Sequence, residues 1–97
     1  FCAATEHVMK HLTQDQLRCL TVIAFLRGRW VKGYYALRRL GGECRVASEE
    51  AHHFCWVGAW EHLYGVKPNR AVELHRLNDR ARDFEELAAD MRKVYVL

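Results

Sequence analysis

Hydrophobic and polar positions follow helical spacing over four stretches of the chain and lose it over one. The first stretch opens with Thr13-Gln14-Asp15-Gln16, which matches a helix capping box, and runs through apolar residues to Leu26. Its apolar positions surround the helix on all sides. We therefore expect this helix to be buried on more than one side.

A second buried helix is predicted over about Ser48 to Tyr64, with its first residue as the N-cap and Gly65 as the left-handed residue after its end. Gly58 lies mid-helix, where glycine costs about 1 kcal/mol relative to alanine. We expect it to let another backbone or a ligand approach closely. Together with Cys55 and Ala59 it is predicted to form a tight seam against the first helix.

Two shorter helices complete the pattern. Pro68 and Asn69 open a segment with apolar residues at helical spacing that ends near Asn78-Asp79. Asp83 and Glu86 then form an aspartate version of the capping box at the start of the last helix. The apolar positions of that helix are Phe84, Leu87, Ala88, Met91 and Val94.

The stretch from Arg29 to Ala47 keeps no helical period. Its β-forming residues flank the Gly41-Gly42 pair, which favours a short hairpin or an ordered loop. Residues Leu37 to Leu40 fit equally well as one helical turn closed by Gly41.

These elements predict a mainly α fold. We expect one compact domain over residues 1–97, with four to five short helices and a small β-hairpin or ordered loop between the two buried helices. Residues 1–12 are expected to add a weak helical turn and to be loosely attached. A chain of 97 residues that is 51% hydrophobic can fill one core without metals or disulfides.

The sequence disfavours a membrane protein, a secreted protein and a disulfide-bonded protein. No apolar run approaches the roughly 20 residues that a membrane helix needs. No basic start followed by an apolar middle suggests a signal peptide, so a cytoplasmic location is expected. The four cysteines include Cys19 and Cys55 inside apolar patterns, where a reduced thiol acts as a small hydrophobe, and we expect no disulfide.

Positive charge is concentrated between Arg27 and Arg45, where six basic residues face one acid, a net charge of +5 against +3 for the whole chain. Basic residues interleaved with aromatic ones suit phosphate binding with base stacking, an acidic protein partner, or a plain solvated surface. The predicted binding residues in this segment are Arg29, Trp30, Lys32, Tyr34, Tyr35, Arg38 and Arg39. Asp79 is the eighth predicted binding residue, and it lies outside this segment among the arginines near the end of the third helix.

We expect no metal and no cofactor. Glu49-x-x-His52 and Glu50-x-x-His53 have the spacing of di-iron helices, but only one predicted helix offers that motif. For catalysis, His62 lies about 10 Å of helical rise from Cys55, too far to activate its thiol. His75 or Asp79 could reach Cys55 through the fold, yet a cysteine in so apolar a run is expected to be inert.

The order of the motifs resembles a small bacterial and phage domain family of unknown function. Trp30-x-x-Gly33, Cys55-x-x-Gly58-Ala59 and Asn78-Asp79 carry the resemblance, which covers about Leu17 to Val94. No activity comes with that family. Arg80-Ala81-Arg82-Asp83 replaces the threonine-bearing turn that usually follows the last motif.

The sequence therefore predicts a small non-enzymatic binding protein, of the kind a phage uses as an accessory or counter-defence protein. Its expected partner is an acidic protein surface or an anionic nucleotide-like ligand, and a homo-oligomer stays open. A nucleic-acid-binding accessory protein is the alternative, and a cysteine-dependent enzyme comes third.

Overall fold

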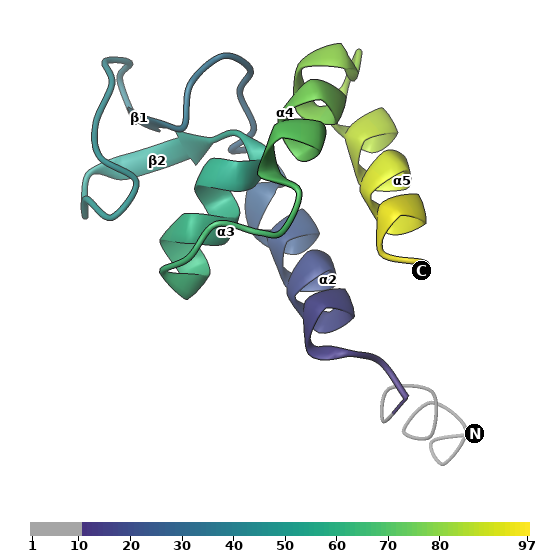
Figure 1. Ribbon diagram of the computed structural model, residues 1–97. Helices are drawn as coiled ribbons and strands as arrows, with labels where there is room; N and C mark the ends of the chain where they lie inside the picture. The colour runs from purple at the N-terminus through teal and green to yellow at the C-terminus, as the bar shows by residue number, and fades with distance from the viewer. Residues whose placement is uncertain (1–10) are drawn as a thin grey trace.

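The computed structural model describes residues 11–97, which form four helices and one two-stranded antiparallel sheet (Figure 1). The mainly helical fold with a small hairpin is confirmed. Each helix packs against two others, in the order α2, α3, α4, α5 and back to α2, and the hairpin projects from one side of this ring. The elements are α2 (Gln14–Leu26), β1 (Ala36–Arg38), β2 (Ala51–Phe54), α3 (Trp56–Tyr64), α4 (Ala71–Arg80) and α5 (Phe84–Val94).

Helix α2 begins as predicted. The Thr13 side chain accepts a hydrogen bond from the Gln16 backbone N–H, and the Gln16 side chain accepts one from the Thr13 N–H, which completes the capping box. The Gln16 side chain also donates to the carbonyl of Tyr95, and so ties the start of α2 to the end of α5. Both α3 and α5 pack on α2, in agreement with its expected burial on more than one side.

The helix predicted from Ser48 to Tyr64 is wrong in its first half. Residues Ala51–Phe54 form β2, and the helix begins only at Trp56, with Cys55 as its N-cap. Tertiary pairing overrides the local pattern here, because both sides of Phe54 are hydrogen-bonded to other segments: its N–H donates to the Arg29 carbonyl and its carbonyl accepts from the Val31 N–H. The end of the helix is as predicted, with Gly65 in the left-handed conformation.

The hairpin is asymmetric. Ala36 pairs with Phe54 and Leu37 with His53, and the register shifts before Arg38 pairs with Ala51. The Gly41-Gly42 pair turns the chain just after β1, where the Arg38 N–H donates to the Gly42 carbonyl, so the alternative of a helical turn over residues 37–40 is wrong. The partner strand lies well beyond the diglycine, in the stretch that was predicted as helix.

The last two helices are confirmed. Helix α4 runs to Arg80, and the Asp83 carboxylate caps α5 by accepting from the Glu86 N–H. Leu74 of α4 and Leu87 and Met91 of α5 are fully or almost fully buried in the same core as α2 and α3. Helix α4 is thus held between α3 and α5, which sets the position of the residues on its other faces.

The turn predicted over residues 1–12 lies, for residues 1–10, outside the described part of the chain. Cys19, Cys44 and Cys55 are free thiols. Within residues 11–97, no helix has the length and apolar character needed to cross a membrane.

Candidate functional site

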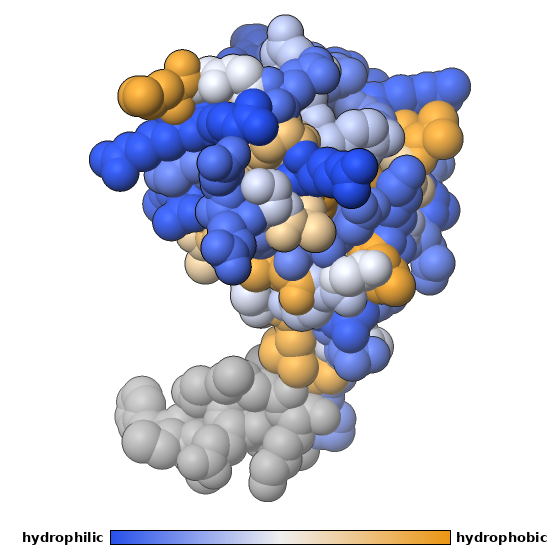
Figure 2. Space-filling model, turned by 90° about the vertical axis from the view of Figure 1, so that its left-hand side faces the viewer, coloured by the Kyte–Doolittle hydropathy of each residue, from blue (hydrophilic) through white to orange (hydrophobic). Residues whose placement is uncertain are grey.

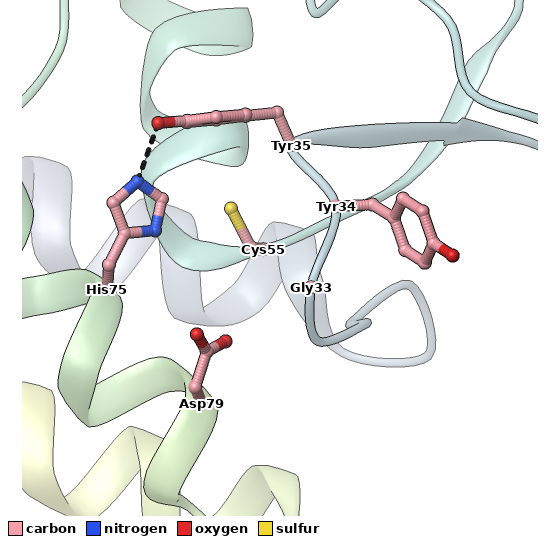
Figure 3. A pocket seen from close by; sticks show the side chains of 6 residues that line it. All are labelled: Gly33, Tyr34, Tyr35, Cys55, His75 and Asp79. Carbon is pink, nitrogen blue, oxygen red and sulfur yellow. Dashed lines mark hydrogen bonds between the residues drawn. The ribbon is translucent and has the colours of Figure 1, made fainter.

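A pocket of about 240 Å³ lies where the segment after Trp30, the start of α3 and the outer face of α4 meet (Figure 3). Tyr35 runs along one side and His75 stands across from it. The Asp79 carboxylate lies at the opposite end, and the Cys55 sulfur is directed toward the space between them. The residues that line the pocket are Gly33, Tyr34, Tyr35, Cys55, His75 and Asp79.

Cys55 is held by the first turn of α3. Its Sγ atom accepts a hydrogen bond from the Gly58 N–H at 3.3 Å, and only 3% of the residue is exposed. Burial raises the pKa of the Cys55 thiol; the N–H groups of Gly58 and Val57 oppose this shift, and the Asp79 carboxylate adds to it. The thiol is therefore a neutral group in the pocket wall at neutral pH.

Tyr35 and His75 form a joined pair across the pocket. The phenol oxygen of Tyr35 lies 2.9 Å from His75 Nε2, and the two rings meet edge to face at 85°. The Lys67 ammonium lies 5.3 Å from the centre of the Tyr35 ring, a cation–π distance. The bond to Tyr35 uses Nε2 of the His75 imidazole (Figure 3).

The buried side chain of Asn78 holds together the elements that form the pocket. It is fully buried, and its Oδ1 accepts from the Trp30 indole N–H at 2.8 Å and from the Trp56 backbone N–H at 2.9 Å. These bonds tie the segment before Gly33 and the N-terminus of α3 to α4, one residue before Asp79. Asn78 therefore joins three elements of the fold.

At Gly58 the backbone of α3 lies very close to the backbone of the pocket wall. An added Cβ at this position would lie 1.9 Å from the Tyr35 carbonyl oxygen. The predicted close approach of another backbone at Gly58 is therefore confirmed, and the nearest atoms belong to Tyr35 in the pocket wall. The seam against the first helix stays a prediction. The motifs that carry the family resemblance thus gather at one place, either lining the pocket or positioning its walls.

The structure brings together only part of the predicted binding residues. Tyr34, Tyr35 and Asp79 line the pocket, although the ring of Tyr34 points away from it (Figure 3). Trp30 acts through its bond to Asn78, and the Lys32 ammonium lies 5.7 Å from the centre of the Trp30 ring.

Some of the remaining basic residues are engaged by neighbouring groups. Arg38 is paired with Glu50 at 2.7 Å and donates to the Glu43 carbonyl, while Arg27 is paired with Glu85. The Arg29 guanidinium lies over the Phe25 ring. Arg39 is exposed beyond the end of β1. Folding thus neutralises two of the six cations that the sequence places in this segment.

The face on the hairpin side is mainly hydrophilic, and its apolar side chains are scattered in small groups (Figure 2). Leu40, at the tip of the loop after β1, is 99% exposed. Singly exposed apolar residues are ordinary on protein surfaces, so this view gives no indication of an apolar docking surface.

Gly33, Cys55 and His75 are the pocket residues that we did not predict as binding residues. The sequence analysis named His75 and Asp79 as residues that could reach Cys55, and their spacing puts them one turn apart on one face of α4. Nothing in the sequence places that face opposite Cys55. No group of three or more His, Cys, Asp or Glu side chains within residues 11–97 is arranged to hold a metal ion.

Comparison with known proteins returned no match to a protein-family model, to a curated protein or to a solved structure. The resemblance to the bacterial and phage family stays a prediction.

Cys55 is expected to react with iodoacetamide more slowly than Cys44 at pH 7. Its thiol is buried and its pKa is raised, whereas Cys44 is only half-buried. Peptide mass spectrometry of the native protein over time gives the order of alkylation, and the unfolded protein serves as the control in which all sites react. Alkylation of Cys55 before Cys44 would contradict this assignment.

Proposed function

We propose that this protein is a non-enzymatic binding protein for a small nucleotide-like ligand, and that the base of the ligand enters the pocket at Tyr35, His75 and Asp79. The observation that carries the proposal is the convergence of an aromatic face, an imidazole and a carboxylate on one cavity. Each of these groups suits a heterocyclic base, by stacking or by hydrogen bonding.

The size and charge of the pocket support a ligand bound with its base inside and its phosphate outside. A pocket of 240 Å³ is smaller than the roughly 300–1,000 Å³ typical of drug-sized ligands, and suits a base better than a whole nucleotide. The Asp79 carboxylate repels a phosphate but accepts hydrogen bonds from N–H groups. Guanine presents two adjacent N–H donors on one edge, so it is the base we favour.

The phosphate of such a ligand would lie outside the pocket. Lys67 lies against the ring of Tyr35, which lines the pocket, and Lys32 directly precedes Gly33, another lining residue. Their attraction would act on the anionic part while Asp79 selects the base. Holding such a ligand without converting it is how a phage-type accessory or counter-defence protein would act on a host signal.

The test is calorimetric titration with the four ribonucleosides and their 5′-monophosphates. We expect guanosine monophosphate to bind most tightly, and Asp79→Asn to weaken it at least tenfold, because the variant replaces a charged double acceptor by a group with one donor and one acceptor end. Asp90→Asn, which makes the same change on α5 away from the pocket, is the matched control.

Two results would contradict the proposal. One is the absence of binding by any nucleoside or nucleotide, and the other is equal binding by the Asp79→Asn and Asp90→Asn variants. Binding of any random oligonucleotide with a steep salt dependence would instead favour the nucleic-acid alternative. Salt-sensitive binding of acidic proteins alone would favour the protein-partner alternative.

A second candidate, cysteine-dependent catalysis, is favoured by one observation: Cys55, His75 and Asp79 line the same pocket, with the thiol at a helix N-terminus. Rapid alkylation of Cys55 in the experiment above would support it. The hydrogen bond between His75 and Tyr35 and the buried neutral thiol place it second.

A further inference from the structure

A second depression, of about 380 Å³, lies on a different face of α4. Three arginines line it, Arg70 just before the helix and Arg76 and Arg80 within it. Leu77 and Val94 supply its apolar part, and Glu73 is its one acid. We propose that this depression binds a phosphate-bearing anion of about the size of a diphosphate.

The periodicity of α4 separates this face from the pocket described above. At about 100° per residue, Leu74 and Asn78 share the buried face, and His75 and Asp79 share the face toward Tyr35. Residues 73, 76, 77 and 80 share the third face, where Arg70 joins them from the preceding turn. The helix therefore presents two separate sites of opposite electrostatic character.

The charge on the third face is not balanced within the described chain. Arg70 reaches Glu73 only at 3.5 Å, and no ion pair is formed by Arg76 or Arg80 with any of residues 11–97. Other surface arginines are closely paired: Arg82 lies 2.9 Å from Glu86, and Arg38 lies 2.7 Å from Glu50. Two like charges four residues apart on a helix repel each other, so Arg76 and Arg80 leave a positive field that an external anion can neutralise.

The chemistry of these groups favours phosphate over a single carboxylate. Guanidinium groups donate paired hydrogen bonds to phosphate oxygens, and three of them offer more donors than one carboxylate can accept. Half-buried Leu77 and Val94 beside them exclude water from part of the depression, which strengthens charge interactions there. A volume of 380 Å³ has room for more than orthophosphate.

The probe is inorganic pyrophosphate, titrated into the whole chain at low and constant ionic strength and followed by NMR shifts of backbone amides. We expect saturable shifts centred on residues 70–80 and 94. The double variant Arg76→Gln/Arg80→Gln is expected to weaken binding at least tenfold, while Arg82→Gln, which removes an arginine already paired on an exposed surface, leaves it within twofold. Thermal unfolding of each variant checks that the fold is kept.

Equal binding by the double variant and the Arg82→Gln control overturns the proposal, as do shifts that never saturate. Sulfate and chloride at the same ionic strength test for selectivity, and equal shifts with all three anions also overturn it. A single-stranded oligonucleotide is the last probe. If the double variant weakens binding of the oligonucleotide alone, the site binds a phosphodiester backbone and the small-anion proposal is wrong. Because guanosine has no phosphate, its binding in the other pocket is scored independently of this site.

Discussion

Gly58→Ala is expected to destabilise the fold at or above the upper end of the roughly 1–3 kcal/mol typical of overpacked cores. The added Cβ would lie 1.9 Å from the Tyr35 carbonyl oxygen, and 2.8 Å from its carbonyl carbon. Both atoms belong to backbone rather than to a flexible side chain. Either α3 or the wall of the pocket must therefore move, and chemical denaturation of wild type and variant measures the cost.

Gly28→Ala is the matched control for this substitution. Gly28 has φ of 80° and no atom within 4 Å of an added Cβ, so alanine there meets only the left-handed backbone penalty of about 1–2 kcal/mol. Because Gly58 abuts Tyr35, a folded Gly58→Ala protein is also expected to lose affinity for the pocket ligand. Wild-type stability in the Gly58→Ala protein would show that the close approach is absent in solution.

Asn78→Ala is expected to cost about 2 to 6 kcal/mol, since each buried donor left without an acceptor costs about 1 to 3 kcal/mol. The two donors are the Trp30 indole N–H and the Trp56 backbone N–H, which both bond to Asn78 Oδ1. Denaturant unfolding followed by tryptophan fluorescence measures the loss.

The exposed residue Asn69 offers the control for Asn78. Asn69→Ala lies just before α4, where a surface substitution is expected to change stability by less than about 0.5 kcal/mol. Equal stabilities of the two variants would mean that Asn78 does not join the three elements. A large loss at Asn78 alone would confirm that the pocket is built around this amide.

The helix ends show how far sequence reasoning reaches. The capping box at Thr13, the cap at Asp83 and the left-handed Gly65 were each predicted from side chains within three or four residues of the helix end. Such signals are local, because the groups that satisfy a helix terminus come from adjacent residues. The existence of α2, α4 and α5 followed from the same local information.

The segment 48–55 shows where this reasoning fails. Its residue pattern predicts the start of a helix. In the structure, however, the backbone of Phe54 is hydrogen-bonded to the backbone of Arg29 and Val31, some 25 residues earlier in the chain. Pairing across such a distance depends on how the whole chain folds, and no window of the sequence contains it. The helix therefore starts seven residues later than the local pattern indicates, and Cys55 becomes its cap.

The sequence by itself determined the helical class of this protein, most of its helix ends, and the residues Trp30, Gly58, Asn78 and Asp79 as worth attention. Only the tertiary structure decided what those residues do. The Trp30 bond to Asn78, the contact of Gly58 with Tyr35 and the meeting of Cys55, His75 and Asp79 each join segments that are 20 or more residues apart. The ion pairs were also decided by the tertiary structure, because they form between groups that are close in space. Glu50 and Glu85 pair with two arginines of the basic segment, whereas Arg76 and Arg80 of α4 form no ion pair with any of residues 11–97.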